Sequence, residues 1–321
     1  MKDALGRDIE YMRISITDRC NLRCRYCMPE EGIEKISMSS ILSYQDIVRI
    51  CTQAVRLGIS RFKVTGGEPL VRRGCTDLIA EMKKIPGVEQ VTLTTNGQLL
   101  KEHLDDLEKA GIDGINVSLD SLDEKRYRMI TRVGELAPVL AGIDAALQRG
   151  LPTKVNCLIQ KGINEDEIMD FAGMAFEKEM EVRFIETMPV GFADADRGVS
   201  NEDILLLLRR EWPHLEPDKR IHGNGPAKYY RLPGKKGAIG LISALHGKFC
   251  GECNRIRITS QGMIKPCLCY DESMDLLNTV REGSDEELKE AIEEAIMAKP
   301  AGHCFEEGPA TEERSMVEIG G

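Results

Sequence analysis

Six short strand-like segments alternate with helical patterns through the first 190 residues of this chain. The segments are rich in β-branched residues, and apolar residues recur at helical spacing in the stretches between them. This alternation predicts βα repeats around a parallel sheet, in which chemistry gathers on the loops after the strands. We therefore expect an incomplete parallel (βα)6 TIM-like barrel with strands at residues 11–17, 61–65, 91–95, 114–119, 153–158 and 181–186.

Two helix starts are indicated by capping residues within this region. Ser43 precedes an apolar helical face and is a favoured N-cap residue. Asn164 and Glu167 have the spacing of a capping box ahead of Ile168. These patterns predict helices that begin at or just after residues 43 and 164.

The alternation stops near residues 189–191, where Pro, Val and Gly interrupt it. We expect a barrel region at 1–190 and a C-terminal region at 191–321 that holds a second cluster and binds substrate. Patterns in the second region predict short strands near 239–243 and 255–259, together with helices near 201–210 and from residue 284.

Three thiols, Cys20, Cys24 and Cys27, lie on the loop after the first predicted strand. Clustered thiolates select zinc or an iron–sulfur cluster, and both ordinarily take four protein ligands. Because this loop offers three, a four-iron cluster held here leaves one iron free for a small molecule. Tyr26 stands before the last Cys, where its ring could cover that molecule.

A second group of three thiols is formed by Cys250, Cys253 and Cys267. Chemistry alone leaves its third ligand open, because Cys269 lies two residues further on. A zinc site completed by Cys269 or His246 is an alternative to a second iron–sulfur cluster.

Charged side chains near these cysteines indicate an anionic ligand. Arg255 and Arg257 alternate along a predicted strand, so both guanidinium groups point to one side and can clamp an anion. At the end of the second strand, Gly66 and Gly67 permit close approach to a ligand, and Glu68 can accept a hydrogen bond from an ammonium group.

Composition limits the classes of function. Eleven Cys without a secretion signal favour metal binding over disulfides and place the chain in the cytoplasm. The net charge of −10 argues against nonspecific nucleic-acid binding, and no apolar run is long enough for a membrane span. The phosphate-binding pattern GxxxxGK[S/T] is absent from the sequence, so a bound nucleotide would be a substrate.

The first group, CxxxCxxC with an aromatic residue before the third Cys, resembles the signature of the radical S-adenosylmethionine (SAM) enzymes. The second group resembles the C-terminal cluster site of the GTP 3′,8-cyclases, the first enzymes of molybdenum-cofactor biosynthesis, and Cys267 matches its third ligand. The resemblance spans the whole chain, through GGEP, TTNG, VSLDSL, KVN, FIETMP, RIR and a terminal Gly-Gly. In that family the tail is thought to reach the active site.

The resemblance implies two four-iron four-sulfur (4Fe–4S) clusters, with SAM on the first and the guanine of GTP on the second. Cleavage of SAM would give a 5′-deoxyadenosyl radical that abstracts hydrogen from C3′ of GTP, after which C3′ attacks C8. It assigns SAM to Tyr26, Gly67, Ser118 and Met188, the last through its backbone. It assigns GTP and its chemistry to Arg13, Lys63, Thr94, Lys154, Arg255, Ile256 and Arg257, with Arg183 as an addition.

The implied partners are GTP, an external electron donor and the downstream cyclic pyranopterin monophosphate synthase, for a lyase that is a monomer or a homodimer. Two alternatives stay open from the sequence. One is another radical SAM enzyme with an auxiliary cluster, such as a peptide modifier. The other is a zinc-binding protein without catalysis.

Overall fold

The computed structural model describes residues 1–34, 36–193, 197–246, 249–303, 305, 312 and 314–320. Eight parallel strands form the centre of one curved sheet, and antiparallel strands extend both edges. In sheet order the parallel strands are β10 (Arg255–Ile258), β1 (Tyr11–Ser15), β2 (Arg61–Thr65), β3 (Gln90–Thr95), β4 (Gly114–Ser118), β5 (Thr153–Leu158), β6 (Glu181–Ile185) and β9 (Ala238–Ile242).

The expected six βα units are confirmed, and the sheet contains two parallel strands beyond them. These are β9, which pairs with β6, and β10, which pairs with β1, so the C-terminal region continues the sheet at both sides. The sheet stays open, since the outermost strands gain no further partner in the described ranges. The antiparallel edge strands are β7 (Glu216–Pro217), β8 (Lys228–Arg231), β11 (Met263–Lys265) and β12 (Met274–Asp275).

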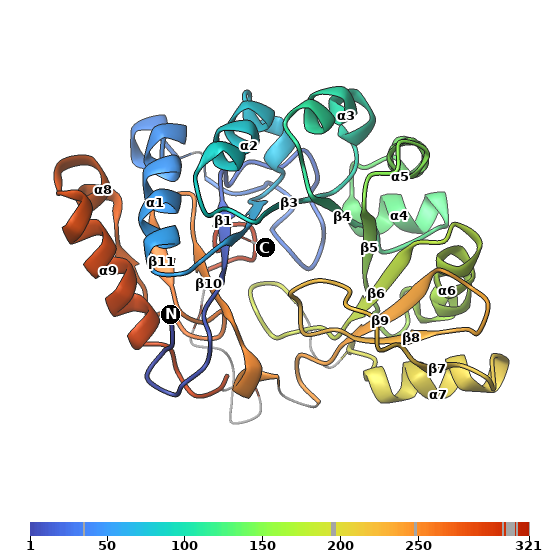
Figure 1. Ribbon diagram of the computed structural model, residues 1–321. Coiled ribbons are helices and arrows are strands. Elements are labelled where there is room, and N and C mark those ends of the chain that lie inside the picture. The colour runs from blue at the N-terminus through green and yellow to red at the C-terminus, as the bar shows by residue number, and fades with distance from the viewer. Residues whose placement is uncertain are drawn as a thin grey trace.

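Figure 1 shows the helices along the outer side of the curved sheet, with α8 and α9 beside α1. Ser43 caps α1 and Ser284 caps α9 through full capping boxes. The α-helices are α1 (Tyr44–Arg56), α2 (Cys75–Lys84), α3 (Leu100–Lys109), α4 (Glu124–Thr131), α5 (Leu136–Gln148), α6 (Ile168–Glu177), α7 (Asn201–Glu211), α8 (Leu277–Glu282) and α9 (Asp285–Met297). Short 3-10 turns are η1 (Met38–Ser40), η2 (Pro69–Val71), η3 (Glu165–Glu167) and η5 (Cys250–Glu252).

Alternation along the strands separates an apolar outer face from a cationic inner face. The outward residues, among them Ile14, Phe62 and Ile256, are buried against the helices. The inward residues lie side by side in register, since Arg13 pairs with both Lys63 and Arg257. Alternate residues of each strand thus form the hydrophobic core on one face of the sheet and the wall of the site on the other. No helix in the described ranges has the length and apolar character of a membrane span.

Candidate active site

A cavity of about 370 Å³ lies on the inner side of the sheet and is lined by both groups of thiols. The first group follows β1 and the second lies on η5 and after β11. Residues more than 200 positions apart therefore open into one space. Of the residues singled out in the sequence, the cavity wall contains Arg13, Cys20, Cys24, Tyr26, Cys27, Gly67, Thr94, Ser118, Met188, Cys250, Cys253, Arg255, Arg257 and Cys267.

The first thiol group is half-buried, and its thiols need a positive partner to ionise. Burial raises the pKa of Cys20 to about 11 and that of Cys27 to about 12. Burial and then the neighbouring Cys27 raise the pKa of Cys24 well above its usual value. Metal binding requires thiolates and supplies the missing positive charge. Three converging soft donors therefore fit an iron–sulfur cluster.

The loop after β2 packs directly on the backbone of the cysteine loop. A Cβ atom at Gly66 would lie 2.4 Å from the carbonyl oxygen of Thr17, and one at Gly67 would lie 2.4 Å from that of Arg19. The Gly67 amide donates to Thr17 O at 2.7 Å. Only glycine permits this approach, so both glycines position the cysteine loop as well as lining the cavity.

Glu68 has a different role from the one expected. Its carboxylate accepts hydrogen bonds from Leu70 N at 3.0 Å, Thr95 Oγ1 at 2.8 Å and Asn96 N at 2.6 Å. The side chain is fully buried and does not line the cavity. Glu68 therefore joins the loop after β2 to the loop after β3, and the prediction that it meets a ligand ammonium group is wrong.

Tyr26 is fixed to the far wall of the cavity by Asp120. Its hydroxyl donates to Asp120 Oδ2 at 2.6 Å, while Asp120 Oδ1 accepts from Leu158 N at 2.8 Å. Burial raises the pKa of Asp120 to about 6. The aromatic ring on the cysteine loop is thus tied to the ends of β4 and β5. Sequence reasoning missed Asp120, although the quoted VSLDSL segment contains it.

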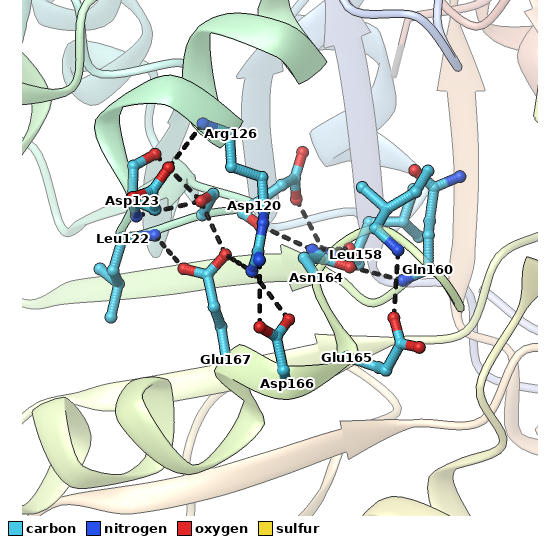
Figure 2. A network of polar contacts seen from close by, with 12 residues as sticks. Asp120, Leu122, Asp123, Arg126, Leu158, Gln160, Asn164, Glu165, Asp166 and Glu167 are labelled. Carbon is cyan, nitrogen blue, oxygen red and sulfur yellow. Dashed lines mark hydrogen bonds and ion pairs between the residues drawn. The ribbon is translucent and has the colours of Figure 1, made fainter.

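Asn164 and Glu167 stabilise this wall through hydrogen bonds to the loops after β4 and β5. Figure 2 shows both side chains pointing toward the loop that carries Asp120. Asn164 donates to Asp120 O at 2.6 Å and to Leu158 O at 2.9 Å, and accepts from Gln160 N at 2.7 Å. Glu167 accepts from Leu122 N at 2.5 Å. The predicted capping box is therefore wrong, since both side chains bond to other loops.

The second thiol group lies beside two cations that the sequence did not single out. Lys299 is buried and donates to Arg255 O at 2.8 Å and Pro266 O at 2.7 Å. Arg7 donates to Cys250 O at 2.9 Å. Burial raises the pKa of Cys253, but Lys299 and then Arg255 outweigh it, so the net shift is downward. These cations favour thiolate ligands at this site.

Cys253 and Cys267 both lie near Cys250. Burial, followed by the nearby Cys253 and Cys267 sulfurs, raises the pKa of Cys250. Cys269 also lines the cavity. His246, the other candidate ligand, has a side chain that is 66% exposed and lies 3.5 Å from Glu186. In the described ranges, no three Cys, His, Asp or Glu side chains are arranged to hold a single metal ion.

Arg13, Arg255 and Arg257 form a cationic wall of the cavity beside the second thiol group, with Arg257 buried and the other two half-buried. Burial, with Arg13 next, lowers the pKa of Arg257 to about 9. Within the described part of the chain, Arg255 Nε and Arg257 Nη1 are buried and have no hydrogen-bond partner. Buried guanidinium donors without acceptors are costly, so this wall fits an anionic ligand.

The remaining predicted cations lie deeper on the inner face and do not line the cavity. Burial and then Arg183 lower the pKa of Lys63 well below its usual value. Lys154 pairs with Glu181 at 2.5 Å and donates to His222 O, while Arg183 donates to Asn116 at 2.6 Å. Ile256 packs into the outer core, which leaves only its backbone for a ligand.

The C-terminal tail enters the same cavity. Met316 and Val317 line the wall, and the Val317 amide donates to the Cys27 thiol. Figure 1 places this end of the chain beside β1, inside the arc of strands. Gly320 is described, whereas Gly321 and Cys304 lie outside the described residues.

Two family models match this chain. The model "Radical SAM superfamily" matches residues 14–175, and "Molybdenum Cofactor Synthesis C" matches residues 180–305. Similar curated proteins include the GTP 3′,8-cyclase of Clostridium perfringens (strain SM101 / Type A), at 43% identity, and that of Syntrophomonas wolfei, at 45%. Each alignment covers 100% of both chains.

Solved structures show the same fold at low sequence identity. Streptococcus suis SuiB bound to precursor peptide SuiA is 16% identical, with a TM-score of 0.65 over 98% of this chain and 76% of that one. Native anSMEcpe with bound AdoMet is 13% identical, with a TM-score of 0.57 over 97% and 93% of the two chains.

Proposed function

Because the chain belongs to the radical SAM superfamily and, within it, to the family of the GTP 3′,8-cyclases, we propose that it cyclises GTP to (8S)-3′,8-cyclo-7,8-dihydroguanosine 5′-triphosphate. This lyase reaction is the first step of molybdenum-cofactor (molybdopterin) biosynthesis. The observation that carries the proposal is the shared cavity, in which two incomplete thiol sites face a wall of arginines.

Two 4Fe–4S clusters and SAM fit the residues present. Cys20, Cys24 and Cys27 hold the first cluster and leave one iron for SAM. Cys250, Cys253 and Cys267 hold the second cluster. When bound, the first cluster and SAM supply one-electron, hydrogen-abstracting chemistry, which no side chain provides.

The protein's own residues bind and orient the two ligands. SAM contacts Gly67, Ser118, the backbone of Met188 and the ring of Tyr26, which Asp120 holds in place. The unpartnered donors of Arg255 and Arg257, with Arg13, bind the phosphates of GTP, and Thr94 lies on the same wall. Lys63, Lys154 and Arg183 strengthen the positive field below, and Ile256 contributes its backbone.

Buried walls and the tail exclude water from the cavity. Val317 and Ile319 are fully buried, and Val317 lies against the first thiol group. Exclusion of water strengthens every charged contact inside and protects reactive species from side reactions. The barrel region at 1–190 and the region at 191–321 thus contribute complementary halves of one site.

Several features of the cellular setting belong to the same proposal. An external donor delivers the electrons, and the product passes to cyclic pyranopterin monophosphate synthase. The enzyme acts in the cytoplasm as a monomer or homodimer.

Anaerobic reconstitution tests the proposed function. The reconstituted chain should carry about eight irons, four for each cluster. Incubation with SAM, a reductant and GTP should yield 5′-deoxyadenosine and a nucleotide isomeric with GTP, since GTP loses one hydrogen atom and regains an electron and a proton. Chromatography with mass analysis detects both products. If 5′-deoxyadenosine accumulates while GTP stays intact, the assigned substrate is wrong.

A further inference from the structure

The C-terminal tail is fastened to the sheet by a buried ion pair. Lys265, the last residue of β11, donates to Glu312 Oε2 at 2.5 Å and to Tyr270 O at 2.7 Å. The side chains of Lys265 and Glu312 are 0% and 1% exposed. Arg314 also contacts Glu312, through Nε at 2.8 Å and Nη2 at 2.9 Å. One carboxylate in the tail therefore binds two cations.

This anchor connects the tail to the second thiol group. The Glu312 amide donates to Cys269 O at 3.3 Å, on the loop that also carries Cys267. Beyond the anchor, Val317 reaches the Cys27 thiol of the first group. Glu312 thus lies beside the loop of the second thiol group, and Val317 lies beside the first thiol group.

The tail fits closely where it passes the barrel. A Cβ atom at Gly191 would lie 3.1 Å from Ser315 Cα, and one at Gly320 would lie 2.8 Å from Ser15 Cβ. Such clearances define the path of the tail but supply little attraction. The directional contacts come from the anchor, from the Val317 amide, which donates to the Cys27 thiol, and from Ser315, which donates to Glu318 within the tail itself.

The position of Lys265 gives the pair a second consequence. Lys265 lies opposite Arg257 in the antiparallel pairing of β10 and β11, and opposed residues face the same side of a sheet. An uncompensated ammonium group there would repel Arg257 and compete for an anionic ligand. Glu312 supplies the compensating charge only when the tail lies in this path.

We propose that Glu312, held by Lys265, is a positioning residue that sets the C-terminal tail in the active site and leaves Arg257 to the substrate. This inference rests on the proposed function for its catalytic consequence only. The tail position itself can be measured without turnover.

Limited trypsin digestion of the reconstituted full-length protein tests the position. Cleavage after Arg314 releases residues 315–321 and is followed by intact mass. In the Glu312→Gln variant, which keeps the shape but loses the charge, we expect cleavage at Arg314 to be at least tenfold faster. Lys236→Met removes an exposed pair with Glu179 and should leave that rate unchanged.

A double variant separates positioning from folding. Lys265→Met with Glu312→Met replaces the pair by apolar side chains, which often preserves stability. We expect a melting temperature near that of the original chain, fast cleavage at Arg314, and at least tenfold less cyclised GTP per 5′-deoxyadenosine. Wild-type protection of the tail in either variant would overturn the proposal. An unaltered chain that makes no cyclised GTP but protects Arg314 would instead refute the proposed function alone.

Discussion

Arg255 and Arg257 are the residues on which substrate binding most depends. Both line the cavity wall, and in the described part of the chain Arg255 Nε and Arg257 Nη1 are buried donors that lack acceptors. We expect Arg255→Ala or Arg257→Ala to raise the KM for GTP at least about thirtyfold, because a lost buried charge contact costs about 2 kcal/mol or more. SAM cleavage to 5′-deoxyadenosine should persist in part.

A matched control is Arg231→Ala, on an outer strand, whose exposed side chain pairs with Glu216. Steady-state kinetics of both products distinguish the variants. An equal loss of cyclisation and SAM cleavage in the Arg255 and Arg257 variants would contradict their assignment to GTP.

Substitutions of the two neighbouring cysteines after β11 should have opposite effects on the iron content. Cys267 lies near Cys250, as Cys253 does, whereas Cys269 is a fully buried neighbour. Cys267→Ala should lower the iron content from about eight to about four per chain, and Cys269→Ala should leave it near eight. Iron analysis after anaerobic reconstitution decides between them, and the reverse pattern would make Cys269 the ligand.

Glu68 predicts a pH dependence of stability. Burial raises the pKa of Glu68 to about 7, so folding favours its protonated form. Its contribution to the free energy of unfolding is therefore largest below pH 4.5 and is lost as the pH rises to about 7. In denaturant unfolding of the metal-free, reduced chain, the free energy of unfolding of Glu68→Gln should rise relative to that of the original chain across this interval. A constant difference between the two would exclude this titration.

Among the elements, the clamp beneath the β4 and β5 loops has the largest expected effect on stability. Asn164 bonds three backbone groups and is almost fully buried. Asn164→Ala leaves these groups unsatisfied and should lower the free energy of unfolding by about 3 kcal/mol. Asn278→Ala, at an exposed position of α8, should change it by less than about 0.5 kcal/mol. Equal unfolding midpoints for the two variants would show that the clamp does not stabilise the fold.

The same clamp shows where local patterns mislead. Asn164 and Glu167 have capping-box spacing, yet their side chains bond to loops that are distant in sequence. Ser43 and Ser284 obey the local rule, and each side chain accepts from the backbone amide three residues later. Contacts with segments distant in sequence therefore decide whether the Asn164 and Glu167 pattern is used as a cap.

For the whole molecule, the sequence predicts the six βα repeats well and the way the C-terminal region extends the sheet poorly. The six βα units have local periodicity, and the same alternation places Arg255 and Arg257 on one face. The pairing of β9 with β6 and of β10 with β1 has no local signal. The contacts of Lys299 and Glu312 likewise arise only from packing across the chain, so these residues appear only in the structure.

One cavity should bring the SAM site and GTP together for hydrogen transfer. The most direct measurement uses GTP deuterated at C3′ and mass analysis of the 5′-deoxyadenosine formed. We expect 5′-deoxyadenosine that carries one deuterium, together with a cyclised nucleotide that lacks it. Unlabelled 5′-deoxyadenosine alongside labelled product would contradict this transfer.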